Sequence, residues 1–298
     1  MSQNSVTHKT WFILFAISIV AGLYLRSSGA FRGLEVPYQF HPDETKQVTA
    51  LHNYLQGHYV WYTGSVFYDG YPYGLNHVDE WLLRPVFTVR TCLLRIFHGT
   101  NANSAIPDMQ AMYYWARALR ILYGMTVLLL AYFTARRLFE KTGARWLTVT
   151  LAAMAPVSIC VSHSASGDIG VDLFSGLALL MLCIYADKGR AGHLFLAGLA
   201  TGMAFGCKYN GLLCGIAIFL YVLLELLSEK RLKRFLIQSV IAGTGCLLGI
   251  LISTPAFFIN FHQTRRDMIS NFMFIKNYDV TREFITKPFH VKAWLGIT

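Results

Sequence analysis

The stretch ARALRILYGMTVLLLAYFTARRLF, residues Ala116 to Phe139, decides the class of fold because it holds one long apolar run. A bilayer core of about 30 Å requires roughly 20 apolar residues in one helix. The stretch closes on the basic pair Arg136 and Arg137, and such pairs are typical of cytoplasmic loops. It therefore predicts a transmembrane helix that ends on the cytoplasmic side.

The composition of the whole chain agrees with this class. Apolar and aromatic residues make up 54% of the 298 residues and charged residues only 14%, as expected for a polytopic membrane protein. The net charge of +10 could indicate nucleic-acid binding, but the cations fall in short clusters between apolar runs, as in cytoplasmic loops. We therefore exclude nucleic acid. The six cysteines form neither a disulfide framework nor a CxxC metal motif.

The apolar runs predict an all-α integral membrane protein with about seven transmembrane helices. The first run lacks a suitably placed small-residue cleavage site and is followed by further spans, so we expect a retained anchor rather than a removed signal peptide. The predicted spans are residues 8–26, 112–136, 146–164, 168–187, 191–207, 211–228 and 235–259.

The positive charges predict the orientation. With a cytoplasmic N-terminus, the inside loops carry clusters of cations and the opposite short hairpins carry almost none, Lys208 excepted. We expect a multi-pass protein of the plasma (inner) membrane. The inside cations are Arg136, Arg137, Lys141, Arg145, Lys188, Arg190, Lys230, Arg231, Lys233 and Arg234.

Residues 27–111 then form the first extracytoplasmic loop, which is too long for a simple connection and too apolar to be disordered. Within it, Trp81 to Phe97 has apolar residues at helical spacing with polar residues on one side. This pattern predicts an amphipathic helix in the outer membrane interface, or alternatively a helix packed on a soluble core.

The loop also contains FHPDETKQV, Phe40 to Val48, in which Asp43 and Glu44 follow Pro42. Proline followed by acids is a common helix start, because proline has no amide hydrogen to lose there and carboxylates favour the positive end of the helix dipole. The same geometry would hold an ionised carboxylate at the membrane surface, as a general base requires.

Two more charged positions are predicted on the same side. In SHSASGDIGVDLF, Asp168 lies at the outer end of the fourth span and Asp172 one turn deeper, where an acid is costly and usually functional. Asp168 could instead be an ordinary first-turn acid. In GCKYNGLL, Lys208 could hold a lipid phosphate or extend along a helix end to the surface. Together these groups suit an anionic lipid carrier.

Five segments in order resemble the GT-C membrane glycosyltransferases of family 39, which include bacterial and archaeal relatives of protein O-mannosyltransferases and aminoarabinose transferases. The resemblance implies a GT-C-like catalytic module over residues 1–298. Because family members usually run longer, it also implies an N-terminal fragment truncated at its C-terminus. The segments are FHPDE (residues 40–44), YDGYPYGL (68–75), the span of residues 116–139, SHSASGDIGVDLF (162–174) and GLATGMAFGCKYNG (198–211).

The resemblance further implies an enzyme that moves a sugar, with inversion, from polyprenyl or dolichyl phosphate to a lipid, glycan or protein acceptor on the extracytoplasmic face. On that basis Asp43 is the candidate base, Glu44 orients the acceptor or coordinates a cation, and Asp168 supports the site. The expected substrate-binding residues are Lys208 and Arg117 for the carrier phosphate, Tyr209 beside the lysine, Tyr71 in the aromatic stretch and His41 beside the acids.

Three alternatives stay open from the sequence, and one of them is a purely structural membrane subunit. His41 with Asp43 and Glu44 could hold a divalent metal ion, although one histidine beside two acids is a thin ligand set. A transporter or channel could use the same outer-face acids and Lys208, but it predicts inverted repeats and midplane charges. The sequence shows no internal repeat.

Overall fold

The computed structural model describes residues 3–28, 30–31, 44–58, 74–98, 106–259, 261–262, 265–266 and 269. Within these ranges the secondary structure is helical, without strands. The helices are α1 (Gln3–Ser27), α2 (Glu44–Leu55), α3 (Gly74–His98), α4 (Met109–Leu138), α5 (Thr142–Met154), α6 (Pro156–His163), α7 (Asp168–Lys188), α8 (Ala191–Cys207), the 3₁₀ helix η1 (Tyr209–Cys214), α9 (Gly215–Glu229), α10 (Leu232–Ser253) and α11 (Ala256–Ile259).

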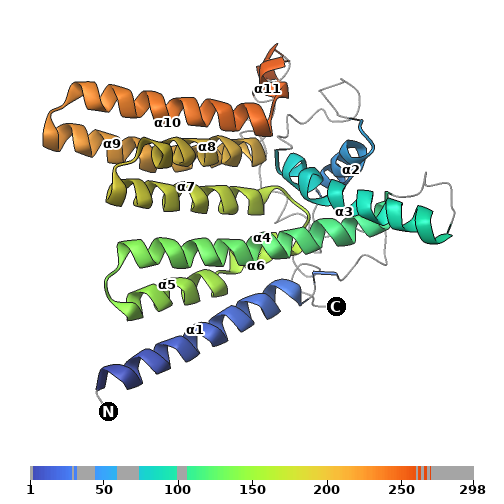
Figure 1. Ribbon diagram of the computed structural model, residues 1–298, viewed down its shortest axis with the longest axis horizontal. Helices are drawn as coiled ribbons and strands as arrows, with labels where there is room; N and C mark the ends of the chain where they lie inside the picture. Colours follow the sequence, from blue (N-terminus) through green and yellow to red (C-terminus); the bar gives the residue numbers. More distant parts are fainter. Residues whose placement is uncertain are drawn as a thin grey trace, which may run out of the picture.

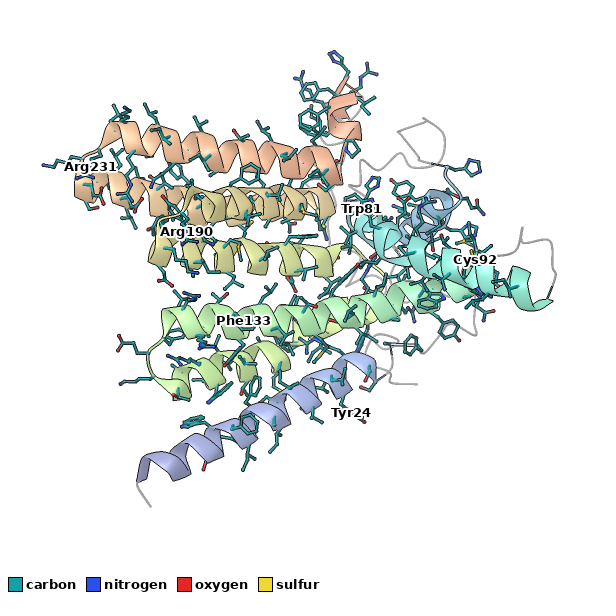
Figure 2. All side chains as sticks on the ribbon, in the orientation of Figure 1. Tyr24, Trp81, Cys92, Phe133, Arg190 and Arg231 are labelled. Atoms are coloured by element: carbon teal, nitrogen blue, oxygen red, sulfur yellow. The ribbon has the colours of Figure 1, made fainter. Side chains whose placement is uncertain are left out.

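The long helices lie side by side in one bundle, and α2 and α3 gather at one of its ends (Figure 1). We call this the loop-helix end, because it carries α2, α3, the start of α7 and the end of α8. The other end carries the α4–α5, α7–α8 and α9–α10 connections, and we call it the basic end. Arg190 and Arg231 both lie there, whereas Trp81 lies at the loop-helix end (Figure 2).

The predicted membrane fold is confirmed. By length and composition, five helical stretches in the described ranges could span a membrane, and the bent pair of α5 and α6 makes a sixth. Helix α8 is apolar but has only 17 residues, at the lower limit for a bilayer. Each of the seven predicted spans is mostly helical, although α8 is short and residues 209–214 begin the sixth span as a 3₁₀ helix. The seventh span, predicted over residues 235–259, ends earlier, because α10 stops at Ser253 and α11 is a separate short helix.

The span predicted over residues 146–164 is not one continuous helix. The structure breaks this span between α5 and α6 with a bend of 47°. The cause is Pro156, which lacks an amide hydrogen and drives the preceding residue out of the helical region. Accordingly, Ala155 is extended, with φ −63° and ψ 114°.

Arg26 of α1 satisfies the carbonyl groups that this break exposes. Its Nη1 donates to the carbonyl of Ala153 at 2.9 Å and its Nη2 to that of Ala152 at 3.2 Å. Nη2 also donates to Ser158 Oγ at 3.0 Å. Since Arg26 is fully buried and carbonyls at a helix end need partners, this contact binds α1 to the broken span. The Asp172 carboxylate also attracts the Arg26 guanidinium electrostatically.

Close backbone contact between α8 and α10 sets the position of the α8 C-terminus. A Cβ atom on Gly202 of α8 would lie 2.1 Å from the Cys246 carbonyl oxygen, and one on Gly249 of α10 would lie 2.2 Å from the Leu199 carbonyl oxygen. Only glycine permits this approach, as is common between membrane helices. The same contact extends to Gly206, so it reaches the end of α8 just before Lys208.

Helix α3 contains the predicted amphipathic segment and begins seven residues earlier than expected, at Gly74. Leu83 and Phe87 are buried in the core that α3 shares with α4 and α7. A second apolar row is exposed on the same helix, at spacings of three and four residues. That this row lies in the membrane interface stays a prediction. The row consists of Leu82, Val86, Val89, Leu93 and Ile96.

Candidate functional site

The candidate site begins with Glu44, the first residue of α2 and fully buried. Its two carboxylate oxygens accept hydrogen bonds from Nε and Nη2 of Arg117 in α4, both at 2.9 Å. One of these oxygens also accepts from the backbone amide of Ala165 at 2.7 Å. Nη1 of Arg117 donates to the Ala30 carbonyl at 2.8 Å. Glu44 therefore fixes the start of α2 to α4 and to the α6–α7 connection.

The second part of the site is the ion pair between Asp168 and Lys208. Asp168 is the first residue of α7 and Lys208 directly follows α8, and their Oδ1 and Nζ atoms are 2.5 Å apart. The two side chains are 24% and 37% exposed. Unlike Glu44 and Arg117, this pair can be reached from outside the protein.

The two parts adjoin. The amide that binds Glu44 belongs to Ala165, three residues before Asp168. A Cβ atom on Gly167 would lie 3.0 Å from the Cys207 carbonyl oxygen and 3.6 Å from Nε2 of Gln47 in α2. The structure thus brings Glu44, Asp168 and Lys208, from three distant parts of the sequence, to the loop-helix end.

A buried cluster that the sequence reasoning missed lies behind these residues. Arg120 of α4 pairs with Asp79 of α3, with Nη1 2.8 Å from Oδ1 and Nη2 2.7 Å from Oδ2. The hydroxyl of Tyr123 donates to the same carboxylate at 2.7 Å, and Nε of Arg120 donates to the Ser166 carbonyl at 3.0 Å. Two arginines three residues apart inside a span could have signalled the cluster, because charges there usually have buried partners.

Two buried amides of the site keep hydrogen-bonding capacity. Asn76 of α3 donates through Nδ2 to the backbone carbonyl of Gln47 at 3.0 Å. Within the described residues, however, Asn76 Oδ1 and both amide atoms of Gln47 have no hydrogen-bond partner. Buried polar atoms are usually paired. These amides therefore keep hydrogen-bonding capacity for an ordered water or a hydroxyl group.

The loop helices are held together by a smaller contact outside the spans. The ring of His77 in α3 stacks on Tyr54 of α2 with centroids 4.7 Å apart. Burial lowers the pKa of His77, and the nearby Glu80 carboxylate partly opposes this shift. Glu80 also pairs with Arg84, which donates to the Tyr54 carbonyl at 2.8 Å. These contacts fix α3 against α2.

Residues 113–257 match the family of dolichyl-phosphate-mannose-protein mannosyltransferases. This match supports membership of the chain in the GT-C superfamily of membrane glycosyltransferases. No curated protein matches the chain. The matched range includes Arg117, Asp168 and Lys208, so it covers the parts of the site that lie on α4, α7 and α8. The family match favours a glycosyltransferase over a transporter or channel.

Of the other predicted site residues, the structure describes Tyr209 but not Asp43, His41 or Tyr71. The latter three lie outside the described residues, so their roles stay predictions. Tyr209 is the first residue of η1, and its ring lies 5.3 Å from that of Phe205. Among the described residues no group of three His, Cys, Asp or Glu side chains could hold a metal ion. The metal prediction rests on His41 and Asp43 together with Glu44, and because the first two lie outside the described residues it stays a prediction.

Proposed function

We propose that this GT-C protein transfers a hexosyl or pentosyl group, with inversion at the anomeric carbon, from polyprenyl or dolichyl phosphate to an acceptor on the extracytoplasmic face. The supporting observation is the meeting of the buried Glu44 carboxylate with the accessible Asp168–Lys208 pair at one end of the bundle. A carrier phosphate requires a cation, and an acceptor hydroxyl or amine requires a base. Lys208 provides the cation at this end, and we assign the base to Asp43, the residue before Glu44 in the sequence.

The orientation follows from the two ends of the bundle. The connections between α4 and α5, α7 and α8, and α9 and α10 carry the loop cations at the basic end (Figure 1). The positive-inside rule assigns such connections to the cytoplasm. On this assignment the loop-helix end faces outward, and the acceptor, whether lipid, glycan or protein, approaches from outside the plasma (inner) membrane.

Lys208 is the residue to which we assign the carrier phosphate. Its ammonium group is partly exposed and is held by the Asp168 carboxylate, so a phosphate could join or replace that carboxylate as its partner. Phosphate leaves readily, and the protein must position it and balance its charge rather than protonate it. Arg117 is less suited, because its guanidinium already binds Glu44 and the Ala30 carbonyl.

Asp43 remains the candidate base, and Glu44 is assigned a positioning role. Both oxygens of Glu44 accept hydrogen bonds from Arg117, and one of them also accepts from Ala165, so Glu44 is committed to holding α2. Inversion requires in-line attack from the face opposite the departing phosphate. The base and Lys208 must therefore lie on opposite sides of the sugar, which suits residues from the first loop and from a distant hairpin.

The test uses membranes that contain the intact protein and a labelled polyprenyl-phosphate sugar. Label should leave the lipid for an acceptor, and the product should have the opposite anomeric configuration. Asp43→Asn should lower turnover about a hundredfold to ten-thousandfold with the protein still in the membrane. Asp187→Asn, which alters an exposed carboxylate at the basic end, is the matched control. Near-normal transfer by Asp43→Asn would remove Asp43 as the base.

A second variant tests the phosphate assignment. Lys208→Ala should mainly raise the donor concentration needed for half-maximal rate, whereas Lys141→Ala at the basic end should leave it unchanged. Asp168→Asn keeps the size of the side chain but removes the charge that holds Lys208, so donor affinity should change there too. Unchanged donor affinity in Lys208→Ala would contradict the assignment, even if the transfer reaction itself is confirmed.

A further inference from the structure

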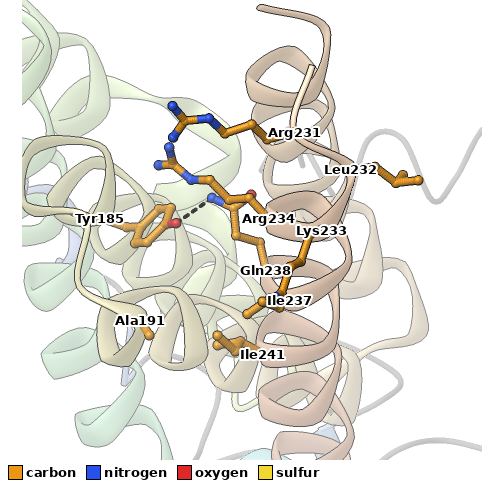
Figure 3. A pocket seen from close by; sticks show the side chains of 10 residues that line it. Tyr185, Ala191, Arg231, Leu232, Lys233, Arg234, Ile237, Gln238 and Ile241 are labelled. Carbon is orange, nitrogen blue, oxygen red and sulfur yellow. Dashed lines mark hydrogen bonds between the residues drawn. The ribbon is translucent and has the colours of Figure 1, made fainter. Parts of the chain in front are cut away.

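A cavity of about 660 Å³ opens at the basic end, and Figure 3 shows its lining residues. The start of α7 and the end of α8, where Asp168 and Lys208 lie, are at the opposite end of the bundle (Figure 1). The cavity lies between the α7–α8 connection, at Gly189 and Ala191, and the first turns of α10. Its volume is in the range of small-molecule sites. The proposed transfer reaction does not use this cavity.

One wall of the cavity is cationic. Arg231, Lys233 and Arg234 line it at the start of α10 (Figure 3). Arg234 is held by Glu225 and Glu229, with distances of 2.7 to 3.1 Å. Arg231 lies 3.6 Å from Glu229 with 71% of its side chain exposed, and no described ion pair holds Lys233. Lys233 is thus available for an anion, and Arg231 is held only by one exposed ion pair at 3.6 Å.

A buried amide provides an independent polar feature. Gln238 lines the cavity and is 4% exposed. Its Nε2 donates to the Tyr185 hydroxyl at 2.6 Å and to Glu225 Oε2 at 2.5 Å, as drawn for Tyr185 in Figure 3. Within the described residues its Oε1 has no hydrogen-bond partner. Because the bonds to Nε2 fix the amide, Oε1 is a positioned acceptor for a hydroxyl group.

The remaining wall is apolar. Ile237 and Ile241 line the cavity one and two turns further along α10 than Lys233. Leu232 and Ile237 are 59% and 50% exposed, as expected where a spanning helix faces lipid. The cavity therefore changes from cationic at the end of the bundle to apolar along the helix, which matches an amphiphile lying parallel to α10.

We propose that this cavity binds an anionic glycerophospholipid whose head group carries a free hydroxyl. The phosphate lies against Lys233 and Arg231, the head-group hydroxyl donates to Gln238 Oε1, and an acyl chain follows Ile237 and Ile241. Basic pockets between helix ends on the cytoplasmic side recognise anionic head groups in this way. A zwitterionic lipid would lack the net charge, and an inorganic phosphate would lack the chain.

The test uses the purified full chain in lipid nanodiscs and measures bound lipid by native mass spectrometry. The three arms are phosphatidylcholine alone, phosphatidylcholine with one fifth phosphatidylglycerol, and phosphatidylcholine with inorganic phosphate at the same concentration. We expect phosphatidylglycerol to be retained and to raise the melting temperature. Replacing Lys233 or Arg231 by alanine should weaken its retention about fivefold each. High salt should reduce the effect only partly, because the chain contact remains.

Lys141→Ala is the matched control, because Lys141 is an exposed cation at the same end that does not line the cavity. Equal retention of phosphatidylglycerol and phosphatidylcholine would overturn the proposal. An equal loss in the Lys141 variant would also overturn it, since binding would then reflect overall charge. If inorganic phosphate alone reproduced the rise in melting temperature, the site would bind free phosphate and the lipid would be excluded. None of these outcomes depends on transferase activity.

Discussion

Two glycines of α10 should respond in opposite ways to the same substitution. A Cβ atom on Gly249 would lie 2.2 Å from the Leu199 carbonyl oxygen and 3.0 Å from the Gly202 Cα, whereas one on Gly243 would have nothing within 4 Å. Both positions are helical, and alanine is favoured over glycine in a helix by about 1 kcal/mol. The difference between the two variants therefore measures the contact between α8 and α10.

The size of the effect follows from which atoms are in the way. Relieving the 2.2 Å contact requires the two helices to separate by about 1 Å, because a backbone carbonyl cannot rotate aside as a side chain can. Overpacking typically costs 1–3 kcal/mol. Because the separation would also loosen the contacts of Gly198, Gly202 and Gly245, we expect about 3 kcal/mol for Gly249→Ala. In a chain of this size this lowers the melting temperature by about 6 to 12 °C.

The assay is thermal unfolding of the two purified variants and the wild type in the same detergent. Gly243→Ala should melt at or slightly above the wild-type temperature. Because the α8–α10 contact places Lys208, Gly249→Ala should also raise the donor concentration needed for half-maximal transfer. Equal melting temperatures for the two variants would refute the close packing.

Three further outcomes are expected from the buried charges and from His77. Arg120→Met should destabilise the protein by about 3–5 kcal/mol because it leaves Asp79 buried without its cation, and Asp79→Leu in the same chain should restore much of this loss in thermal unfolding. Glu44→Gln should lower both melting temperature and transfer, because it leaves Arg117 without a carboxylate. Because burial lowers the pKa of His77, the unfolded chain binds more protons, so stability should fall as the pH decreases through about 6.5. Melting temperatures at about pH 7.5 and 5.5 should differ less in His77→Gln.

The spans could be predicted because hydrophobicity is a local property. The second and fourth spans were expected at residues 112–136 and 168–187, and α4 and α7 cover Met109–Leu138 and Asp168–Lys188. The bend before α6 was missed, although Pro156 was visible. A proline predicts the loss of one hydrogen bond. Whether the span bends depends also on a partner for the exposed carbonyls, and Arg26, which binds the Ala152 carbonyl, is 126 residues away in the sequence.

The candidate site was only partly predictable, because it also depends on contacts between residues that are distant in the sequence. Asp168 and Lys208 were found because a charge at the edge of an apolar run is conspicuous in sequence. Their direct pairing was not predicted, since it depends on the packing of α7 against α8. Asp79 was overlooked because it lies on an amphipathic helix, where an acid is ordinary. Only its contact with Arg120, 41 residues later, shows that it is buried.

The described ion pairs that join different helices or connections at the loop-helix end differ in burial. Two of them are buried and hold the helices together, and the third, Asp168–Lys208, is partly exposed. The Glu44–Arg117 and Asp79–Arg120 pairs join different helices and have side chains at most 2% exposed. Breaking either one leaves a buried charge, which is costly, so these pairs hold the loop helices in place. Among the described pairs that join different helices or connections at this end, only Asp168–Lys208 is open, with 24% and 37% of its side chains exposed. A partly exposed pair contributes little to stability, so on the proposed function we expect a phosphate to replace Asp168 as the partner of Lys208 without unfolding the site.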